Sequence, residues 1–150
     1  MATNFPDYTD VFERLNKNNV RYVVIGSFAC ALQGYVRAIA DLDVAISSRP
    51  DEANHSIAVL ASAGFIPSIP LSVTMLTVLR LFDHSRREVN AVVRPYVPFA
   101  ELFERSTNIA IGETTVRVAS VEDLIRAKQT ASQPKDLEDL KHLTQLLKPT

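Results

Sequence analysis

Two acidic residues, Asp41 and Asp43, stand one residue apart in the run DLDVAIS, residues 41–47. The β-branched residues that follow predict a strand, and residues i and i+2 of a strand project from the same face. Neighbouring carboxylates repel each other unless a cation compensates, and Mg²⁺ is commonly held by one or two carboxylates together with substrate phosphates. The pair therefore indicates a metal site. A strand end with two solvated acids, or a turn capped by Asp41, has the same spacing.

Gly26 and Ser27 stand between an apolar run, RYVVI at 21–25, and the helix-like stretch FACALQG at 28–34. Glycine permits a tight turn and a close approach of the backbone, and serine is a common helix N-cap. Free N–H groups at the start of a helix attract phosphate. Gly-Ser alone is most often only a cap, but the order strand, Gly-Ser, helix and Asp-x-Asp places phosphate donors opposite a metal site.

This order resembles the nucleotidyltransferase superfamily of the DNA polymerase β type, whose pattern is Gly-Gly/Ser, a short helix and then Asp-x-Asp/Glu. The stretch YVVIGS, followed by Ala29, Leu32, Gly34, Arg37 and DLD, is similar to its small stand-alone bacterial branch, which includes antitoxin-like minimal nucleotidyltransferases. The tail VRVASVEDLIRAKQTASQPKDLEDLKHL also resembles that branch. The likeness covers about residues 20 to 145 and implies an α+β nucleotidyltransferase-like fold, with a small mixed β-sheet flanked by helices.

By this resemblance, Gly26 and Ser27 contact the triphosphate of an NTP, and Asp41 and Asp43 hold Mg²⁺. The implied reaction moves a nucleoside monophosphate from the NTP to a hydroxyl acceptor and releases pyrophosphate. The acceptor can be a protein hydroxyl, a tRNA end or a small molecule such as an aminoglycoside. We predict further phosphate contacts from Arg37 and Lys128. The competing interpretations are a surface arginine and a solvated helix lysine.

The strand REVNAVV, residues 87–93, departs from the family pattern at Asn90, where relatives usually supply a third carboxylate. A carboxamide can offer an oxygen to a metal, but it cannot act as a general base at neutral pH. Glu88 points to the same face of that strand. One hypothesis is that Glu88 replaces the missing carboxylate, with a solvated strand glutamate as the competing interpretation. The other is that the site binds nucleotide but transfers it slowly or not at all.

Asn90 and Gln133, which stands where relatives often have arginine, favour a rival function. The rival is a nucleotidyltransferase-fold binding protein with weakened turnover, such as an antitoxin paired with a toxin. The intact Gly-Ser and Asp-x-Asp motifs favour the enzyme. A third alternative is a structural domain that binds no nucleotide.

The composition is that of one globular domain over residues 1–150, with 47% hydrophobic and 22% charged residues. The formal net charge of −1 gives no strong sign of duplex nucleic acid binding. The sequence has no apolar run long enough to span a bilayer, and its acidic start is not typical of a secretory signal. The single cysteine, Cys30, lies among apolar residues and fits a buried position in a cytoplasmic protein.

Hydrophobic spacing predicts alternating helices and short strands. The helices are expected at 9–18, 28–34, 50–64, 98–106, 123–131 and 134–148, the strands at 21–25, 41–47, 77–83 and 87–93, and a hairpin at 108–120. The segment 65–73 holds two prolines and is expected to be an edge strand or a loop.

The last of these helices is predicted to have an apolar face and a charged face. The apolar face is made of the leucines at 137, 140, 143, 146 and 147, and the solvated face of Lys135, Asp136, Glu138, Asp139 and Lys141. Elsewhere, His55, His84 and His142 show no spacing typical of metal ligands.

Overall fold

A computed structural model describes residues 7–35, 38–68, 78–131 and 134–147 of the chain. The helices are α1 (Thr9–Lys17), α2 (Gly26–Leu32), α3 (Pro50–Ser62), α4 (Phe99–Arg105), α5 (Val121–Ala131) and α6 (Pro134–Leu146). The strands are β1 (Tyr22–Ile25), β2 (Leu42–Ile46), β3 (Ile66–Pro67), β4 (Val78–Phe82), β5 (Glu88–Val92), β6 (Thr107–Ile111) and β7 (Thr114–Val118). The expected helices and strands are all present, with ends shifted by a few residues.

The described strands form one sheet in the order β3-β4-β5-β2-β1-β7-β6. The pairs β2–β5 and β1–β7 are parallel, and the other neighbours are antiparallel, so the sheet is mixed. The strands β1, β2 and β5 are central, with β1 and β5 on either side of β2. The predicted α+β fold with a mixed sheet is confirmed.

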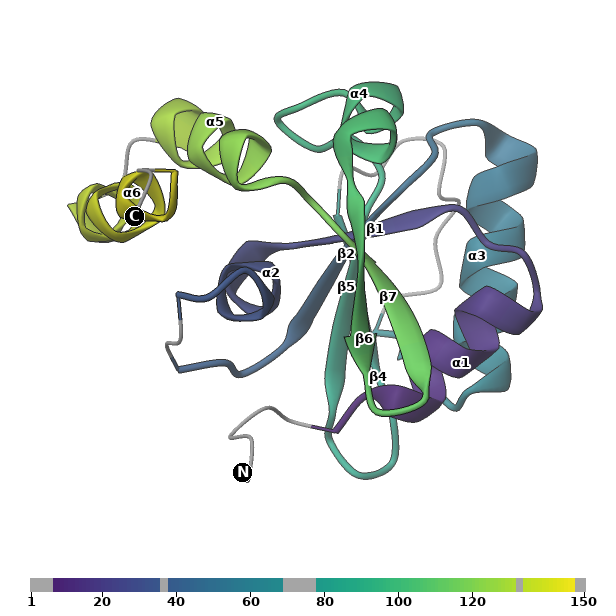
Figure 1. The fold of residues 1–150 in the computed structure, drawn as a ribbon. Helices are drawn as coiled ribbons and strands as arrows, with labels where there is room; N and C mark the ends of the chain where they lie inside the picture. The colour runs from purple at the N-terminus through teal and green to yellow at the C-terminus, as the bar shows by residue number, and fades with distance from the viewer. Residues whose placement is uncertain (1–6, 36–37, 69–77, 132–133, 148–150) are drawn as a thin grey trace.

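Helices lie on both sides of the sheet (Figure 1). Helices α1 and α3 contact each other on one side, whereas α2, α5 and α6 gather on the other side of the view. Phe12 of α1 stacks on Tyr22 of β1 and meets Phe28 of α2 edge-on, with ring centroids 6.4 and 5.8 Å apart respectively. Aromatic contacts of this kind tie α1 to the sheet and to α2.

The alternation of side chains along β4 and β5 separates the core from the polar face of the sheet. Leu79 and Leu81 of β4 and Val89 and Ala91 of β5 are buried, as period-two alternation requires. Their neighbours in sequence therefore project from the opposite face. That face carries Arg80, Glu88 and Asn90, among others. The polar side chains of β4 and β5 therefore lie together on the face of the sheet opposite these buried residues.

Helix α6 does not bury the leucine face that its sequence predicts. Leu143 is fully buried, but Leu137 is 69% exposed. Asp136 and Asp139, predicted to be solvated, are buried at 2% exposure each. The prediction was wrong for these residues because it treated the helix as an isolated amphipathic segment, whereas the buried aspartates have a cationic partner on α5.

The start of α2 also differs from the prediction. The helix begins at Gly26 rather than at residue 28, and its N-cap is Ile25 in an extended conformation. Ser27 therefore lies inside the first turn and is not the N-cap. Cys30, on the same helix, is fully buried as predicted.

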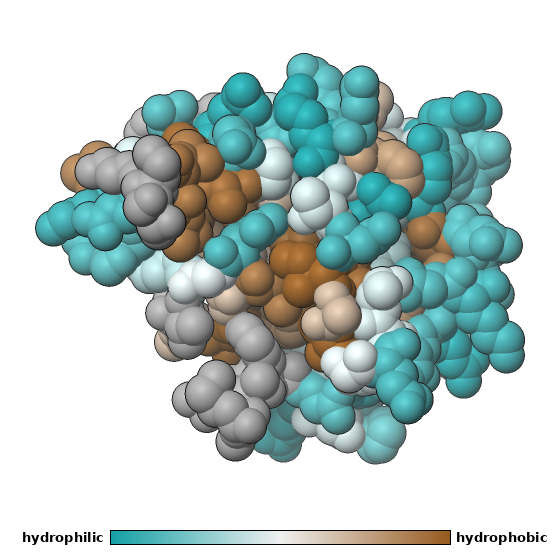
Figure 2. Space-filling view, in the orientation of Figure 1, coloured by the Kyte–Doolittle hydropathy of each residue, from teal (hydrophilic) through white to brown (hydrophobic). Residues whose placement is uncertain are grey.

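Apolar side chains gather between α2 and the β6–β7 hairpin on the face shown in Figure 2. A groove of about 620 Å³ lies there. Its apolar lining includes Phe12, Phe28, Leu32, Ile109 and Ile111. Among the helices of the described residues, none is long and apolar enough to cross a membrane.

Candidate functional site

Parallel pairing of β2 with β5 brings the predicted site residues together. Asp43 of β2 is in register with Asn90 of β5, and Asn90 is in register with Arg80 of β4. On the other side, Asp43 is in register with Ile25, the last residue of β1. Residues in register on neighbouring strands project from the same face. One row of side chains therefore crosses the sheet from β4 to the start of α2.

Asn90 connects the two acidic residues. Its Nδ2 donates one hydrogen bond to Asp41 Oδ2 and one to Asp43 Oδ1, each 2.9 Å long. Asn90 is 9% exposed, and its Oδ1 has no hydrogen-bond partner among the described residues. Buried polar atoms are nearly always paired, so this oxygen is available to accept a hydrogen bond or to ligate a cation.

The two carboxylates are held in an environment that disfavours their charge. Burial raises the pKa of Asp43 to about 6, with the neighbouring charge of Asp41 contributing, while the hydrogen bond from Asn90 acts in the opposite direction. Burial also raises the pKa of Asp41, and the charge of Glu88 adds to that increase. The site therefore has more negative charge than its own residues compensate, which favours a cation.

Gly26 lies directly against Asp43. Its φ is +71°, and a Cβ added at this position would lie 2.4 Å from Asp43 Oδ2. A side chain at residue 26 is excluded both by the backbone conformation and by the carboxylate. The glycine predicted from the motif is thus required by contact with the Asp-x-Asp pair, as well as by the turn from β1 into α2.

Glu88 stands beside the same pair, but it already has a cationic partner. Its carboxylate accepts hydrogen bonds from the Arg80 guanidinium at 3.2 Å, and its side chain is 18% exposed. Burial raises the pKa of Glu88, but Arg80 and Asn90 outweigh that effect, so the pKa is lowered overall. Glu88 is therefore near enough to Asp41 to influence its charge, and it is itself ionised at neutral pH.

Lys128 of α5 forms ion pairs with two acidic residues of α6. Its Nζ lies 2.9 Å from Asp139 Oδ2 and 3.3 Å from Asp136 Oδ1, both on α6. The ammonium charge of Lys128 also lowers the pKa of Asp43, which places the lysine within electrostatic reach of the carboxylates. The interpretation of Lys128 as a solvated helix residue is wrong, because its side chain is 19% exposed and doubly paired.

Asp136 and Asp139 are the functional candidates that the sequence prediction missed. Their i, i+3 spacing puts both on one face of α6, where both meet Lys128. That spacing can be read from the sequence, but the lysine that pairs with both aspartates lies on another helix, α5. Arg37 and Gln133 lie outside the described residues.

A family model described as "Nucleotidyltransferase of unknown function (DUF6036)" matches residues 7–148. The match spans both the Gly-Ser and Asp-x-Asp motifs and the α5–α6 tail. The chain belongs to this family. A search of curated proteins finds no match to this DUF6036 nucleotidyltransferase.

Several solved structures have the same fold as this chain. TM1012 from Thermotoga maritima, provisionally assigned as a nucleotidyltransferase, has 17% identity and a TM-score of 0.66, covering 91% of this chain and 89% of its own. The lincosamide antibiotic adenylyltransferase LnuA, solved with lincomycin, has 12% identity and a TM-score of 0.66 over 95% of this chain and 99% of its own. ANT(2'')-Ia, in complex with adenylyl-2''-tobramycin, has 14% identity and a TM-score of 0.62 over 93% and 87%.

The residues of this DUF6036 nucleotidyltransferase fit Mg²⁺ bound together with a nucleotide. Within the described part of the chain, no group of three or more His, Cys, Asp or Glu side chains is placed to hold a metal by itself. Mg²⁺ does not need such a cage, because one or two carboxylates and substrate phosphates satisfy it. Asp41, Asp43 and the orphaned Asn90 Oδ1 supply oxygen donors of the kind that Mg²⁺ prefers.

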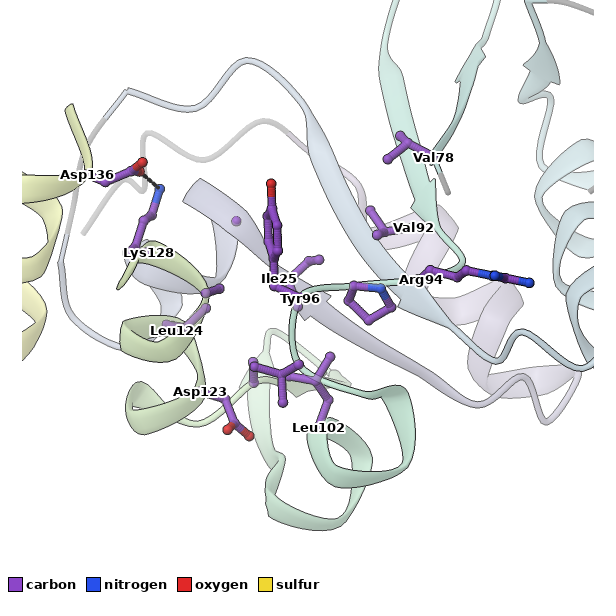
Figure 3. Close-up of a pocket in the computed structure, with 15 residues that line it drawn as sticks. Ile25, Val78, Val92, Arg94, Tyr96, Leu102, Asp123, Leu124, Lys128 and Asp136 are labelled. Atoms are coloured by element: carbon purple, nitrogen blue, oxygen red, sulfur yellow. Dashed lines mark ion pairs between the residues drawn. The ribbon is translucent and has the colours of Figure 1, made fainter. Parts of the chain in front are cut away.

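A cavity of about 410 Å³ lies next to the start of α2 in the DUF6036 protein (Figure 3), and Asp41, Asp43 and Asn90 are not among the residues that line it. In the figure, Lys128 extends from α5 toward Asp136 on one side, and Val78 and Val92 lie on the opposite side. The lining also contains Gly26. It is mainly apolar and includes Ile25, Val97, Leu102, Ala119, Leu124 and Ala127, with Arg94 and Tyr96 as further members. An apolar cavity beside a charged row suits a ligand with one planar or apolar part and one anionic part.

Proposed function

We propose that this protein transfers the nucleoside monophosphate part of an NTP to a hydroxyl group of an acceptor, with Mg²⁺ held by Asp41 and Asp43. The observation that carries the proposal is the Asn90 amide, which donates to both carboxylates over 2.9 Å and leaves its own buried oxygen unpaired. Two converging carboxylates next to a glycine that admits no side chain form a site for a cation and a phosphate.

The triphosphate and the nucleoside of the NTP bind in two neighbouring regions of the site. The triphosphate lies at Gly26 and Ser27, beside the carboxylates, because the missing Cβ at residue 26 lets the backbone approach closely. Lys128, on the far wall of the cavity, offers a positive charge to the phosphates. The nucleoside occupies the apolar cavity, where the rim residue Tyr96 can stack on a base.

The transfer joins the acceptor oxygen to the α-phosphorus and breaks the bond between that phosphorus and the bridging oxygen, so that pyrophosphate leaves. Bound Mg²⁺ would stabilise negative charge on the phosphoryl oxygens. Asn90 keeps Asp41 and Asp43 oriented through Nδ2. Glu88 is the nearest additional carboxylate and would take the proton of the acceptor hydroxyl at one of its oxygens, in competition with its bonds to Arg80.

A second candidate function is nucleotide binding with slow transfer or none. Asn90 favours it, because an amide cannot accept the acceptor's proton, and the Glu88 carboxylate is engaged by Arg80. A toxin partner, which would suit such a binding protein, stays a prediction from the sequence. Both candidates require the same NTP site and differ only in turnover.

Transfer of label from α-³²P-labelled NTPs, in the presence of Mg²⁺, tests the proposal. ATP is the first choice of nucleotide, and lincosamides and aminoglycosides join proteins and tRNA as acceptors, because two structures of the same fold are antibiotic adenylyltransferases. Asp41→Asn and Asp43→Asn are expected to abolish transfer, whereas Asp51→Asn, on the exposed start of α3, leaves it intact. NTP binding without labelled product would favour the second candidate, and wild-type protein that binds no NTP would overturn both.

A further inference from the structure

Helix α6 buries two carboxylates and exposes a leucine between them. Asp136 and Asp139 are each 2% exposed, while Leu137 is 69% exposed. Burying a charged group is unfavourable unless it is paired and hydrogen-bonded. Leu143 is buried on the same face of α6 as the two aspartates, so packing accounts for the leucine but not for the carboxylates. The placement of the aspartates therefore calls for an explanation other than packing.

The explanation lies in their common partner, Lys128. The lysine Nζ is 2.9 Å from Asp139 Oδ2 and 3.3 Å from Asp136 Oδ1. Asp139 is fixed in turn by Tyr35, whose hydroxyl donates to Asp139 Oδ1 over 3.0 Å. Tyr35 itself stacks on His142 of α6, with ring centroids 4.5 Å apart. The ammonium group is thus fixed by two carboxylates, one of which is fixed by a stacked tyrosine.

This cluster stands at the edge of the nucleotide site. Lys128 and Asp136 both line the cavity that Gly26 also lines. Figure 3 shows Lys128 extended toward Asp136 at the cavity wall. A free lysine side chain has many rotamers, and ordering it when a ligand binds costs conformational entropy. A lysine that is already ordered by two carboxylates would not incur that cost when phosphate binds.

We propose that Asp136 and Asp139 are positioning residues, which hold Lys128 so that its ammonium meets the triphosphate of the bound nucleotide. The inference rests on the proposed function and deepens it by assigning α6 a part in NTP binding. The carboxylates act only through Lys128 and do not touch the nucleotide. Tyr35 serves the same purpose one step further away, by fixing Asp139.

The direction in which Asp139→Asn changes ATP affinity distinguishes a positioning role from a purely electrostatic one. Replacing Asp139 by asparagine removes a negative charge, and charge alone would then strengthen the binding of an anion. Positioning predicts the reverse, because Lys128 loses the closer of the two carboxylates that order it. Glu122→Gln is the control, since it removes an exposed carboxylate from α5, the helix that carries Lys128.

The experiment measures Kd for ATP, and KM and kcat where transfer occurs, in Asp139→Asn, Lys128→Met and the double variant. Asp139→Asn is expected to weaken ATP binding about tenfold, the scale of losing one preorganised charged contact. It should raise KM more than it lowers kcat. In the Lys128→Met background the same substitution should have little further effect, because the two residues act as one unit.

The labelling rate of Lys128 with an amine-reactive reagent, followed by mass spectrometry, gives a readout independent of activity. Asp139→Asn should increase the rate, and inorganic triphosphate should protect Lys128 in the wild type. Should Asp139→Asn fold poorly, Tyr35→Phe removes the hydroxyl that donates to Asp139 and should shift Kd and the labelling rate in the same direction.

Unchanged or tighter ATP binding in Asp139→Asn would overturn the inference. It would also be overturned if Asp139→Asn weakened ATP binding by the same factor in the Lys128→Met background as in the wild type. In either case, Asp41→Asn would still lose ATP-dependent transfer, and the proposed function would stand. If wild-type protein binds neither ATP nor triphosphate, the proposed function and the inference both fail.

Discussion

The backbone of Gly26 and the carboxylate of Asp43 are in such close contact that a Cβ on the glycine would lie 2.4 Å from Oδ2. This contact joins the two motifs that the sequence presents separately. The Gly-Ser turn and the Asp-x-Asp carboxylates, which we propose to bind phosphate and metal, therefore form one unit, and a side chain added at residue 26 must displace Asp43.

Substitution of Gly26 by alanine should therefore abolish nucleotide binding. The φ of +71° costs an alanine about 1 kcal/mol or more, and the Cβ must displace the Asp43 carboxylate. Gly112→Ala is the matched control, because Gly112 has a φ of +61° and open space around the added Cβ. Both variants should lose thermal stability, and only Gly26→Ala should lose ATP binding in titration calorimetry. ATP binding by Gly26→Ala at the wild-type affinity would contradict the proposed site.

Replacement of Asn90 by aspartate should lower the thermal stability of the metal-free protein and raise the rate of transfer. Without Mg²⁺ the variant loses two hydrogen bonds to carboxylates and gains a third negative charge, so its Tm should fall. With Mg²⁺ and ATP the added carboxylate supplies the base that the amide cannot, and transfer should rise by at least about a hundredfold.

The control for this substitution is Asn108→Asp, an exposed position on the edge strand β6. It should change neither the Mg²⁺ dependence of Tm nor the transfer rate. A fall in transfer in Asn90→Asp, with ATP still bound, would instead indicate that the amide itself is required.

The core of the site could be predicted from sequence because its motifs are local. Asp41 and Asp43 are two residues apart on one strand, and the alternation of side chains decides that they share a face. Gly26 is the first residue of a short helix. In each case the physical rule operates within a few residues, and the structure brings those residues together as expected.

Relationships across the sheet and between helices could not be predicted in this way. Asn90 reaches Asp41 only because β2 pairs in parallel with β5, and no local pattern specifies that register. The burial of Asp136 and Asp139 contradicts the leucine periodicity of α6, because Lys128 on α5 outweighs the hydrophobic pattern. Side chains that are satisfied by distant partners leave little trace in the sequence around them.

Arg87 should make stability depend on acid pH. It contacts Asp10 and Asp83 at 2.8 Å and lies 5.0 Å from the centre of the Phe65 ring. The hydrogen bond from Arg87 lowers the pKa of Asp10 below the ordinary value of 3.8. Burial raises the pKa of Asp83, but Arg87 outweighs it and the net change is also downward. The stabilisation is therefore complete above pH 3.8 and lost as the pH falls below it.

The Arg87→Met variant should lose about 3 kcal/mol at pH 7, because the buried Asp83 carboxylate keeps its backbone hydrogen bonds but loses its cationic partner. Urea unfolding at several pH values measures the difference from wild type. That difference should narrow below pH 3.8, where the aspartates become protonated. Arg86→Met, at an exposed neighbouring position, should show no such dependence. A constant difference from pH 7 to pH 2 would show that the loss comes from packing rather than from the ion pairs.

Filling the apolar cavity should block the nucleoside without disturbing the fold. Ala127 lines the cavity from α5, and a phenylalanine there would occupy space within its 410 Å³. The variant should bind ATP at least about tenfold more weakly, while inorganic triphosphate, which has no base, should bind as in the wild type. Ala58→Phe, on an exposed face of α3, controls for the added aromatic surface. If Ala127→Phe weakened the binding of ATP and of triphosphate equally, the added ring would be obstructing the phosphates. Unchanged ATP binding would show that the nucleoside does not bind in this cavity.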